Sequence, residues 1–142
     1  MPGEVDCTWI IREAKMRKMR VFVPVLFHRK LIFAPLEKHT KFTRNRFGVA
    51  EPAVHNSMLV SARNLDAVIV PLLGFDKDAN RIGMGGGFYD RSFAFRKYRH
   101  KWQHPLLIGV AYSFQQVESL PTEPWDVPLD VVVTEQKLLE NR

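Results

Sequence analysis

Cysteine is almost absent from this sequence, since Cys7 is the single one among 142 residues. One cysteine excludes an internal disulfide and any metal site built from several thiolates of the same chain. We interpret Cys7 as a small, half-buried side chain without a chemical role. The scarcity of cysteine is typical of proteins of the reducing cytoplasm, where we expect this protein to work.

Long apolar runs are also missing. No stretch approaches the roughly 18 apolar residues that predict a membrane-spanning helix. The first residues, MPGEVD, lack the apolar segment of a secretory signal. We therefore expect no membrane partner. The length of 142 residues fits one domain of ordinary size, so we expect a single domain over residues 1–142.

Histidines with the spacing of a metal site are missing too. His100 and His104 are four residues apart, but Pro105 argues against a helix that would present both on one face. A zinc site is therefore not expected. The five histidines are His28, His39, His55, His100 and His104.

Negative charge is in deficit, because 15 Asp and Glu residues stand against 21 Lys and Arg residues. The formal net charge of +6 favours anionic partners such as nucleic acids, nucleotides or small molecules rich in carboxylates. Charge by itself does not choose among these classes.

Helical and extended patterns alternate along the chain. The patterns predict helices over 7–18 and 88–100, strands over 21–27, 30–35, 66–76, 105–112 and 129–135, and a long polar connection over 36–57. This order is typical of an α/β domain with a mainly parallel sheet. Ligands of such sheets lie beyond the carboxyl ends of the strands. We expect the segment after strand 66–76 and the segment before strand 129–135 at that edge.

The stretch RIGMGGGFYDR, residues 81–91, holds four of the eight glycines within five positions. A glycine-rich loop that enters a helix points backbone N–H groups at one spot, which can bind phosphate. The stretch matches neither the P-loop motif nor the dinucleotide-binding motif, because no Gly-Lys pair occurs and Phe88 stands at the sixth position from Gly83.

Asp90 follows this glycine loop within about one helical turn. A carboxylate beside phosphates is favourable when Mg²⁺ lies between them, since Mg²⁺ binds one or two carboxylates together with phosphate oxygens. Composition leaves two interpretations open: a magnesium–nucleotide site, with Arg81 and Arg91 as cationic donors, or a flexible turn with a capping aspartate.

Longer segments carry a resemblance to a known family. VPLLGFDKDANRIGMGGGFYDR, LLIGVAYSFQ, EPWDVPLDVVVTE and GEVDCTWIIREAKMRKMRVFVPVL closely resemble the 5-formyltetrahydrofolate cyclo-ligase family, from about Glu4 to Glu135. The resemblance implies a Rossmann-like, three-layer α/β/α fold. It also implies that ATP and Mg²⁺ drive conversion of 5-formyltetrahydrofolate, with or without a polyglutamate tail, to 5,10-methenyltetrahydrofolate. The formyl oxygen would be phosphorylated, N10 would close the ring, and ADP and phosphate would be released.

The same resemblance implies roles for particular residues. Glu4, Arg81 and Tyr89 match catalytic positions, Asp90 and Asp130 match two metal-binding aspartates, and Phe47 matches an aromatic residue that packs on the pterin. Glu4 would meet the substrate near its formyl group. The ATP loop would comprise Arg81, Gly83, Met84, Gly85, Gly86, Gly87, Phe88, Tyr89 and Asp90. Folate would touch the part of this loop made of Met84, Gly85, Gly86, Gly87 and Phe88.

The chain also departs from the family pattern. A helix with Lys and Arg residues that touch ATP, followed by a first strand, usually precedes the position of Glu4, so we interpret the chain as N-terminally shortened. Ala79 stands where a turn glycine is common, and Phe88 replaces a frequent tyrosine. Two alternatives to an active ligase stay open. One is an inactive relative that binds folate, nucleotide or a partner. The other is a basic nucleic-acid-binding module, for which residues 91–102 mix bases with aromatics.

Overall fold

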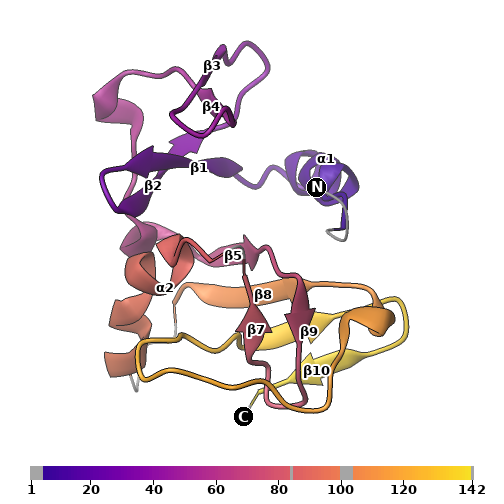
Figure 1. Ribbon diagram of the computed structural model, residues 1–142. Helices are drawn as coiled ribbons and strands as arrows, with labels where there is room; N and C mark the ends of the chain where they lie inside the picture. Colours follow the sequence, from indigo (N-terminus) through magenta and orange to yellow (C-terminus); the bar gives the residue numbers. More distant parts are fainter. Residues whose placement is uncertain (1–4, 84, 100–103, 142) are drawn as a thin grey trace. The chain divides into compact units, whose positions relative to one another are not determined.

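The structure is a computed structural model that describes residues 5–83, 85–99 and 104–141 (Figure 1). The chain divides into two compact units. Unit 1 comprises Met1–Val5 with Arg63–Arg142, and unit 2 comprises Asp6–Ala62. The expectation of one domain stays a prediction. Among the helices within the described ranges, none has both the length and the apolar composition needed to cross a membrane.

Unit 1 is built on a four-stranded sheet in the order β10-β9-β8-β5. The strands β5 (Ala67–Val70), β8 (Leu106–Val110) and β9 (Val131–Val133) run parallel, and β10 (Leu138–Glu140) joins β9 antiparallel. Runs of β-branched residues favour these strands because their side chains pack well on a pleated surface. The prediction of an α/β protein with a mainly parallel sheet is therefore confirmed, while the three-layer arrangement stays a prediction.

The predicted strand over 66–76 is in fact two strands. β5 ends at Val70, directly before Pro71, which has no N–H to continue the ladder. β6 (Gly74–Phe75) then pairs antiparallel with β7 (Arg81–Ile82). The apolar pattern gives no sign of this break, because β5 and β6 are both rich in buried residues and together read as one apolar run.

The segment before β9 lies at the amino ends of the parallel strands, so the expectation that it shares the carboxyl edge was wrong. Asp130 enters β9, and its backbone N–H donates to the carbonyl of Leu107 near the start of β8 (2.9 Å). Parallel neighbours begin at the same edge of a sheet, so a residue that precedes β9 lies beside the start of β8.

The predicted helix over 88–100 was wrong in length and type. The α-helix α2 (Phe88–Ser92) has five residues, and a 3₁₀ helix, η3 (Ala94–Tyr98), follows it. Phe93 joins them with φ −110°, which is not α-helical. The dipole of so short a helix contributes little to a phosphate site at its N-terminus.

A buried carboxylate closes the loop between β6 and β7. Asp76 is 1% exposed and accepts hydrogen bonds from the backbone N–H groups of Asp78, Asn80 and Leu120 (2.9–3.1 Å) and from the Asn80 side chain (3.1 Å). Burial raises the pKa of Asp76, but these hydrogen bonds outweigh it and hold the pKa below its ordinary value of 3.8.

This lowered pKa predicts a loss of stability in acid. A carboxyl group with a depressed pKa in the folded state stabilises above its unfolded pKa, and that contribution is lost as pH falls through the folded value. We expect the free energy of unfolding to decline below about pH 4. Asp76→Asn should lower stability at neutral pH by about 1–3 kcal/mol and flatten this decline. Urea unfolding between pH 2 and 7 measures both, with the exposed Asp78→Asn as control. An unchanged acid decline in Asp76→Asn would contradict the assignment.

Unit 2 contains one helix and two hairpins. Its elements are α1 (Thr8–Met16), β1 (Phe22–Phe27), β2 (Lys30–Pro35), β3 (Phe42–Arg44) and β4 (Ala50–Pro52), with β1–β2 and β3–β4 each paired antiparallel. Short 3₁₀ turns cover Asn56–Met58 in unit 2, Ser113–Gln115 in unit 1 and Ala62–Asn64, which includes the last residue of unit 2 and the first two of the following segment of unit 1. β2 has the bounds predicted for it, and the side chain of Asp6 accepts from Thr8 N at the start of α1 (2.9 Å).

The long connection predicted over 36–57 was partly wrong because it contains the β3–β4 hairpin. Strands of three residues give too little alternation to be recognised in a polar sequence. Two local features specify the turn: the Asn45 side chain accepts from Phe47 N and Val49 N, and Gly48 adopts a φ of +74°.

Candidate functional site

Two described glycines of the glycine loop adopt backbone conformations that favour glycine. Gly85 and Gly87 have φ of +91° and +69°, and a side chain is strained at such values. Gly87 leads directly into α2, and its carbonyl accepts from Arg91 N (3.0 Å). Arg91 also donates from Nη2 to the Gly86 carbonyl (2.8 Å), so the end of the loop is clamped to the helix that follows it.

Arg81 lies in the strand that precedes this loop. Its side chain is 9% exposed and donates from Nη1 to the carbonyl of Pro71, the residue after β5 (3.1 Å). The guanidinium also lies over the Tyr89 ring, 5.5 Å from its centroid. Arg81 is therefore held at the carboxyl end of β5, the sheet edge at which ligands bind in α/β folds.

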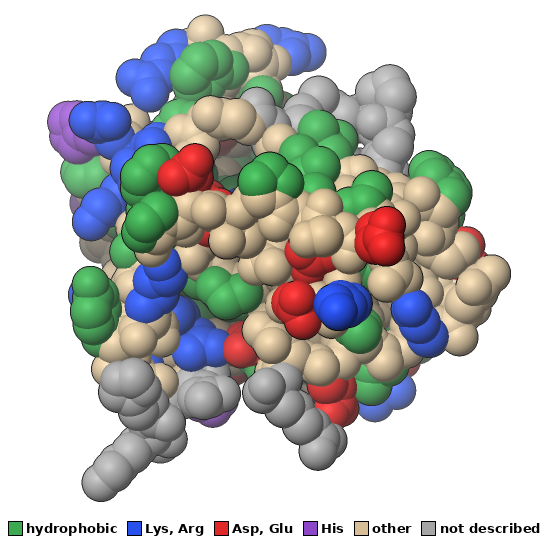
Figure 2. All heavy atoms as spheres, turned by 60° about the horizontal axis from the view of Figure 1, so that its bottom comes forward, with side chains coloured by type: hydrophobic (Ala, Val, Ile, Leu, Met, Phe, Trp, Pro, Cys, Tyr) green, Lys and Arg blue, Asp and Glu red, His purple; other side chains and the backbone are tan. Residues whose placement is uncertain are grey.

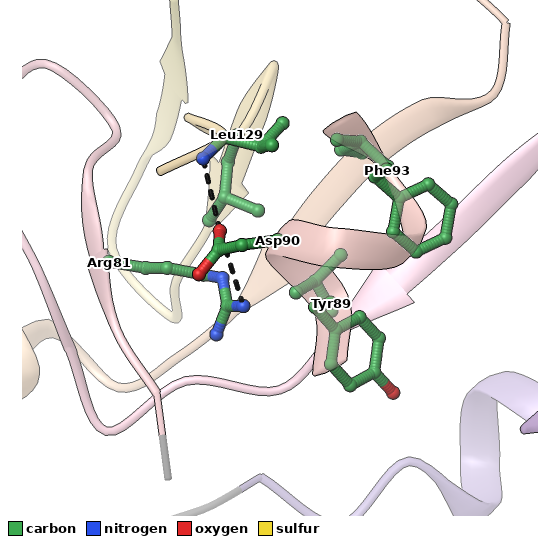
Figure 3. Close-up of a pocket in the computed structure, with 8 residues that line it drawn as sticks. Arg81, Tyr89, Asp90, Phe93 and Leu129 are labelled. Carbon is green, nitrogen blue, oxygen red and sulfur yellow. Dashed lines mark hydrogen bonds and ion pairs between the residues drawn. The ribbon is translucent and has the colours of Figure 1, made fainter. Parts of the chain in front are cut away.

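Asp90 faces Arg81 from α2. Arg81 Nη2 lies 4.0 Å from Asp90 Oδ1, and the same oxygen accepts from Val127 N (3.0 Å). Figure 3 shows the carboxylate and the guanidinium side by side, with the Tyr89 ring on the same helix. A cation and an anion thus meet directly behind the glycine loop, an arrangement suited to phosphate on one side and a metal ion on the other.

A pocket opens where these side chains meet the sheet. Its empty volume is about 180 Å³. This volume includes space that is open to solvent, so the described residues of unit 1 line only a small, partly open hollow here. The pocket is lined by Val70, Arg81, Tyr89, Asp90, Phe93, Leu107, Val127 and Leu129.

The aromatic residues after the glycine loop contact other side chains of unit 1. The Arg91 guanidinium lies 5.0 Å from the centroid of the Phe88 ring. The rings of Tyr89 and Phe93 stack at 6.1 Å. A ligand that packs on Phe88 must therefore share this ring with Arg91 or displace its guanidinium.

Asp130 is held by a partner that the sequence did not reveal. Arg96 donates from Nη2 to both carboxylate oxygens (2.6 and 2.7 Å), and Leu107 N donates to Oδ2 (2.8 Å). The side chains of Arg96 and Asp130 are 8% and 19% exposed. Arg96 also donates from Nε to the Pro105 carbonyl (2.9 Å). No sequence signal links residues 34 positions apart, so this pair could be found only in the folded chain.

The arginines of residues 91–99 bind other residues of unit 1. Arg91 binds the glycine loop, Arg96 binds Asp130, and Arg99 donates to the His104 carbonyl (2.7 Å) while it covers the Phe95 ring at 4.6 Å. These contacts explain why bases and aromatics alternate here. They also reduce the basic surface that this segment could offer to a nucleic acid.

Phe47 belongs to unit 2, at the turn of the β3–β4 hairpin. Its side chain is 60% exposed, and the guanidinium of Arg46 lies 5.0 Å from the ring centroid. Glu4 and Met84 lie outside the described residues. Within the described ranges, no group of three or more His, Cys, Asp or Glu residues is placed to bind a metal ion.

Comparison with known proteins gives one consistent result. The model of the 5-formyltetrahydrofolate cyclo-ligase family matches residues 1–135. The 5-formyltetrahydrofolate cyclo-ligase of Haemophilus influenzae is 40% identical over 137 residues, which cover 92% of this chain and 70% of that protein. The Escherichia coli K12 protein of the same name is 36% identical over 143 residues, 97% of this chain and 75% of that one.

A solved structure agrees with these relatives. The NMR structure of 5,10-methenyltetrahydrofolate synthetase from Aquifex aeolicus has a TM-score of 0.76 at 31% identity, over 100% of this chain and 68% of that one. Sequence and fold thus lead to the same family, which confirms the resemblance first seen around the glycine stretch.

Proposed function

The chain belongs to the 5-formyltetrahydrofolate cyclo-ligase family, a family of ligases, and on this premise we propose that it closes 5-formyltetrahydrofolate to 5,10-methenyltetrahydrofolate at the expense of ATP. The observation that carries the proposal is the joint position of the glycine loop, Arg81 and Asp90 in unit 1. A loop rich in accessible backbone, a buried cation and a carboxylate are what a transferring phosphoryl group requires.

The proposed chemistry solves a problem of reactivity. A formamide carbon is a poor electrophile, and its oxygen is a poor leaving group. Attack of the formyl oxygen on the γ-phosphorus breaks the bond to the β-phosphate and releases ADP. N10 then attacks the formyl carbon and gives up its proton to solvent, and the formyl oxygen departs with phosphate. The residues of the chain mainly position the reactants and neutralise developing negative charge.

We assign these tasks to particular residues. The loop Gly83–Tyr89, including Met84, would surround the ATP phosphates, and Arg81 would bind the transferring phosphoryl group. Tyr89 would keep the Arg81 guanidinium in place through its ring. Glu4 would meet the formyl group, while Phe47 and the loop from Met84 to Phe88 would pack on the folate.

Asp90 fits a magnesium ligand. Both of its contacts given above use Oδ1, and Mg²⁺ needs as few as one carboxylate when phosphates supply further oxygens. When bound, Mg²⁺ would neutralise phosphate charge. Asp130 fits this task less well, because both of its oxygens bind Arg96. Asp130 as a second ligand stays a prediction that requires release from Arg96.

One assay tests the proposed function. Purified protein is mixed with 5-formyltetrahydrofolate and MgATP, and the absorbance of the methenyl product is followed. We expect a rise that requires both ATP and Mg²⁺. A folded sample that gives no ATP-dependent rise but binds folate or nucleotide would favour the inactive relative. Salt-sensitive binding to random DNA without ligase activity would favour the nucleic-acid module.

The net positive charge of the chain comes from the residues of unit 2. Residues 6–62 contain 11 Lys and Arg against four Asp and Glu, a formal charge of +7, whereas the whole chain carries +6. Figure 2 turns the bottom of the Figure 1 view forward, and on that face red Asp and Glu side chains stand among the blue Lys and Arg ones. We propose that this basic unit attracts the carboxylates of a folate polyglutamate tail.

This charge predicts a preference for polyglutamylated substrate. Several exposed charge pairs of about 0.2–1 kcal/mol each should lower the Michaelis constant of a pentaglutamate roughly tenfold relative to the monoglutamate. The preference should shrink as salt rises from about 0.05 to 0.5 M, because salt screens exposed charges. A ratio of Michaelis constants that does not respond to salt would contradict the electrostatic explanation.

We propose that the reaction takes place in the cytoplasm, because a chain with a single cysteine suits a reducing compartment. Cell fractionation tests this placement. Recovery of the protein mainly with membranes or outside the cell would contradict it.

A further inference from the structure

One carboxylate of unit 2 is buried without a role in the proposed chemistry. Glu51 lies in β4 and is 9% exposed. Its Oε2 accepts from the backbone N–H of Leu26 in β1 (2.6 Å) and from the side-chain amide of Asn45 (3.0 Å). One oxygen therefore joins the β3–β4 hairpin to the edge of the β1–β2 hairpin.

The side chain of Asn45 connects Glu51 to the turn of the β3–β4 hairpin. Its amide donates to Glu51, which leaves its carbonyl oxygen directed at the turn, where Oδ1 accepts from Phe47 N (2.9 Å) and Val49 N (3.1 Å). The backbone closes the same turn, since Asn45 N donates to the Val49 carbonyl and Gly48 N donates to the Asn45 carbonyl, both at 2.9 Å. Glu51 thus also fixes which way the Asn45 amide faces.

A second attachment lies on the other side of the turn. Arg46 donates from Nη2 to the carbonyl of His28, at the tip of the β1–β2 hairpin (3.2 Å), and its guanidinium covers the Phe47 ring. Arg44 donates to the Gly48 carbonyl (2.7 Å). The exposed Phe47 ring therefore stands on a turn that is held from both sides, although the turn itself is at the surface.

We propose that Glu51 is a positioning residue for substrate binding: through Asn45, it fixes the turn that carries Phe47. The proposal rests on the function proposed above, in which Phe47 packs on the flat ring system of the folate. A ring held before the ligand arrives loses less conformational freedom on binding. The requirement is for a hydrogen-bond acceptor at Oε2, and a negative charge at this place is not needed.

Two variants separate the acceptor from the charge. Glu51→Gln keeps a carbonyl oxygen for Leu26 N and Asn45, so we expect wild-type kinetics. Glu51→Ala removes the acceptor and should raise the Michaelis constant for 5-formyltetrahydrofolate roughly tenfold to a hundredfold, with kcat and the Michaelis constant for ATP little changed. Because Glu51→Ala also leaves the partly buried Leu26 N without this acceptor, that variant alone could fail by unfolding.

Asn45→Ala tests the same link in a variant that should stay folded. It removes the link to Phe47 and Val49 but leaves the hydrogen bond between Glu51 and Leu26, so the fold should persist and the Michaelis constant for folate should rise as in Glu51→Ala. An unchanged Michaelis constant for folate in a folded Asn45→Ala variant overturns the proposal. Kinetics of Glu51→Gln that match those of Glu51→Ala overturn it as well.

Hydrogen exchange tests the support of the Phe47 turn independently of ligase activity. In wild-type protein the amides of Phe47 and Val49 should be protected, and Asn45→Ala should speed their exchange at least tenfold while Glu51→Gln leaves it unchanged. If wild-type protein lacks ligase activity but shows this exchange pattern, the proposed function fails while the support of the turn stands. If the exchange rates of these amides do not respond to Asn45→Ala, Glu51 does not position Phe47.

Discussion

Arg81→Ala should lower kcat/KM for the ATP-dependent reaction by roughly 10²–10³-fold. The guanidinium is held at the carboxyl end of β5, beside the glycine loop and next to Asp90. Removing one preorganised donor that faces developing negative charge typically has an effect of this size. Arg81→Lys should recover little of the loss, because an ammonium group cannot reproduce the planar contacts with the Pro71 carbonyl and the Tyr89 ring.

Arg99→Ala provides a matched control for Arg81→Ala. Arg99 also donates to a carbonyl, that of His104, and also covers an aromatic ring, that of Phe95. It has no assigned contact with a ligand. Arg99→Ala should lose less stability by urea unfolding, because its contact is exposed and that of Arg81 is part-buried, and only Arg81→Ala should lose activity in steady-state kinetics. Equal losses of kcat/KM in the two variants would show that Arg81 acts only through the fold.

Asp130→Ala should lower the free energy of unfolding by about 3–5 kcal/mol. The substitution leaves Arg96 without its carboxylate in a largely buried position and removes the acceptor of Leu107 N. Breaking a buried ion pair from one side carries a penalty of this order, because a desolvated charge is left unpaired. Urea unfolding measures the change. Asp126→Ala, which removes an aspartate that accepts from Glu123 N in an exposed turn, is the control and should cost about 1 kcal/mol.

A double variant decides whether Asp130 also binds metal. Asp130→Leu combined with Arg96→Met replaces the ion pair with apolar side chains of similar volume, a change that often restores stability. We expect the double variant to regain most of the stability lost in Asp130→Ala. Magnesium-dependent activity that returns with stability would assign Asp130 a structural role only. Activity that stays absent in the stable double variant would support the metal ligand predicted from the family. A loss below about 1 kcal/mol in Asp130→Ala would contradict the importance of the Arg96 pair.

Local sequence predicted those features that depend on neighbouring residues. The bounds of β2 and the apolar character of β5 and β8 follow from the spacing of apolar side chains. The glycine loop could be recognised because positive φ at Gly85 and Gly87 demands glycine in any tertiary context. The spacing of this stretch, together with three further segments of the chain, also indicated the family.

The elements that sequence missed are short. β3, β4, β7 and β10 contain two or three residues each, too few for a period of two to stand out. The helix after the glycine loop was overestimated for the opposite reason. Its apolar spacing continues past Ser92, but the backbone turns to 3₁₀ geometry at Phe93.

What the sequence by itself determined is the chemistry available: a glycine loop with Arg81 and Asp90, a basic first half and the family to which these belong. Only the tertiary structure decided which partner each charged side chain binds, because residues far apart in the sequence form an ion pair only when the chain folds. Arg96 looked like part of a basic surface and instead neutralises Asp130. Glu51 stands in a segment predicted as a polar connection and instead lies buried where the β3–β4 hairpin meets β1. Burial gave each of these side chains its partner, since a desolvated charge or acceptor must be paired within the fold.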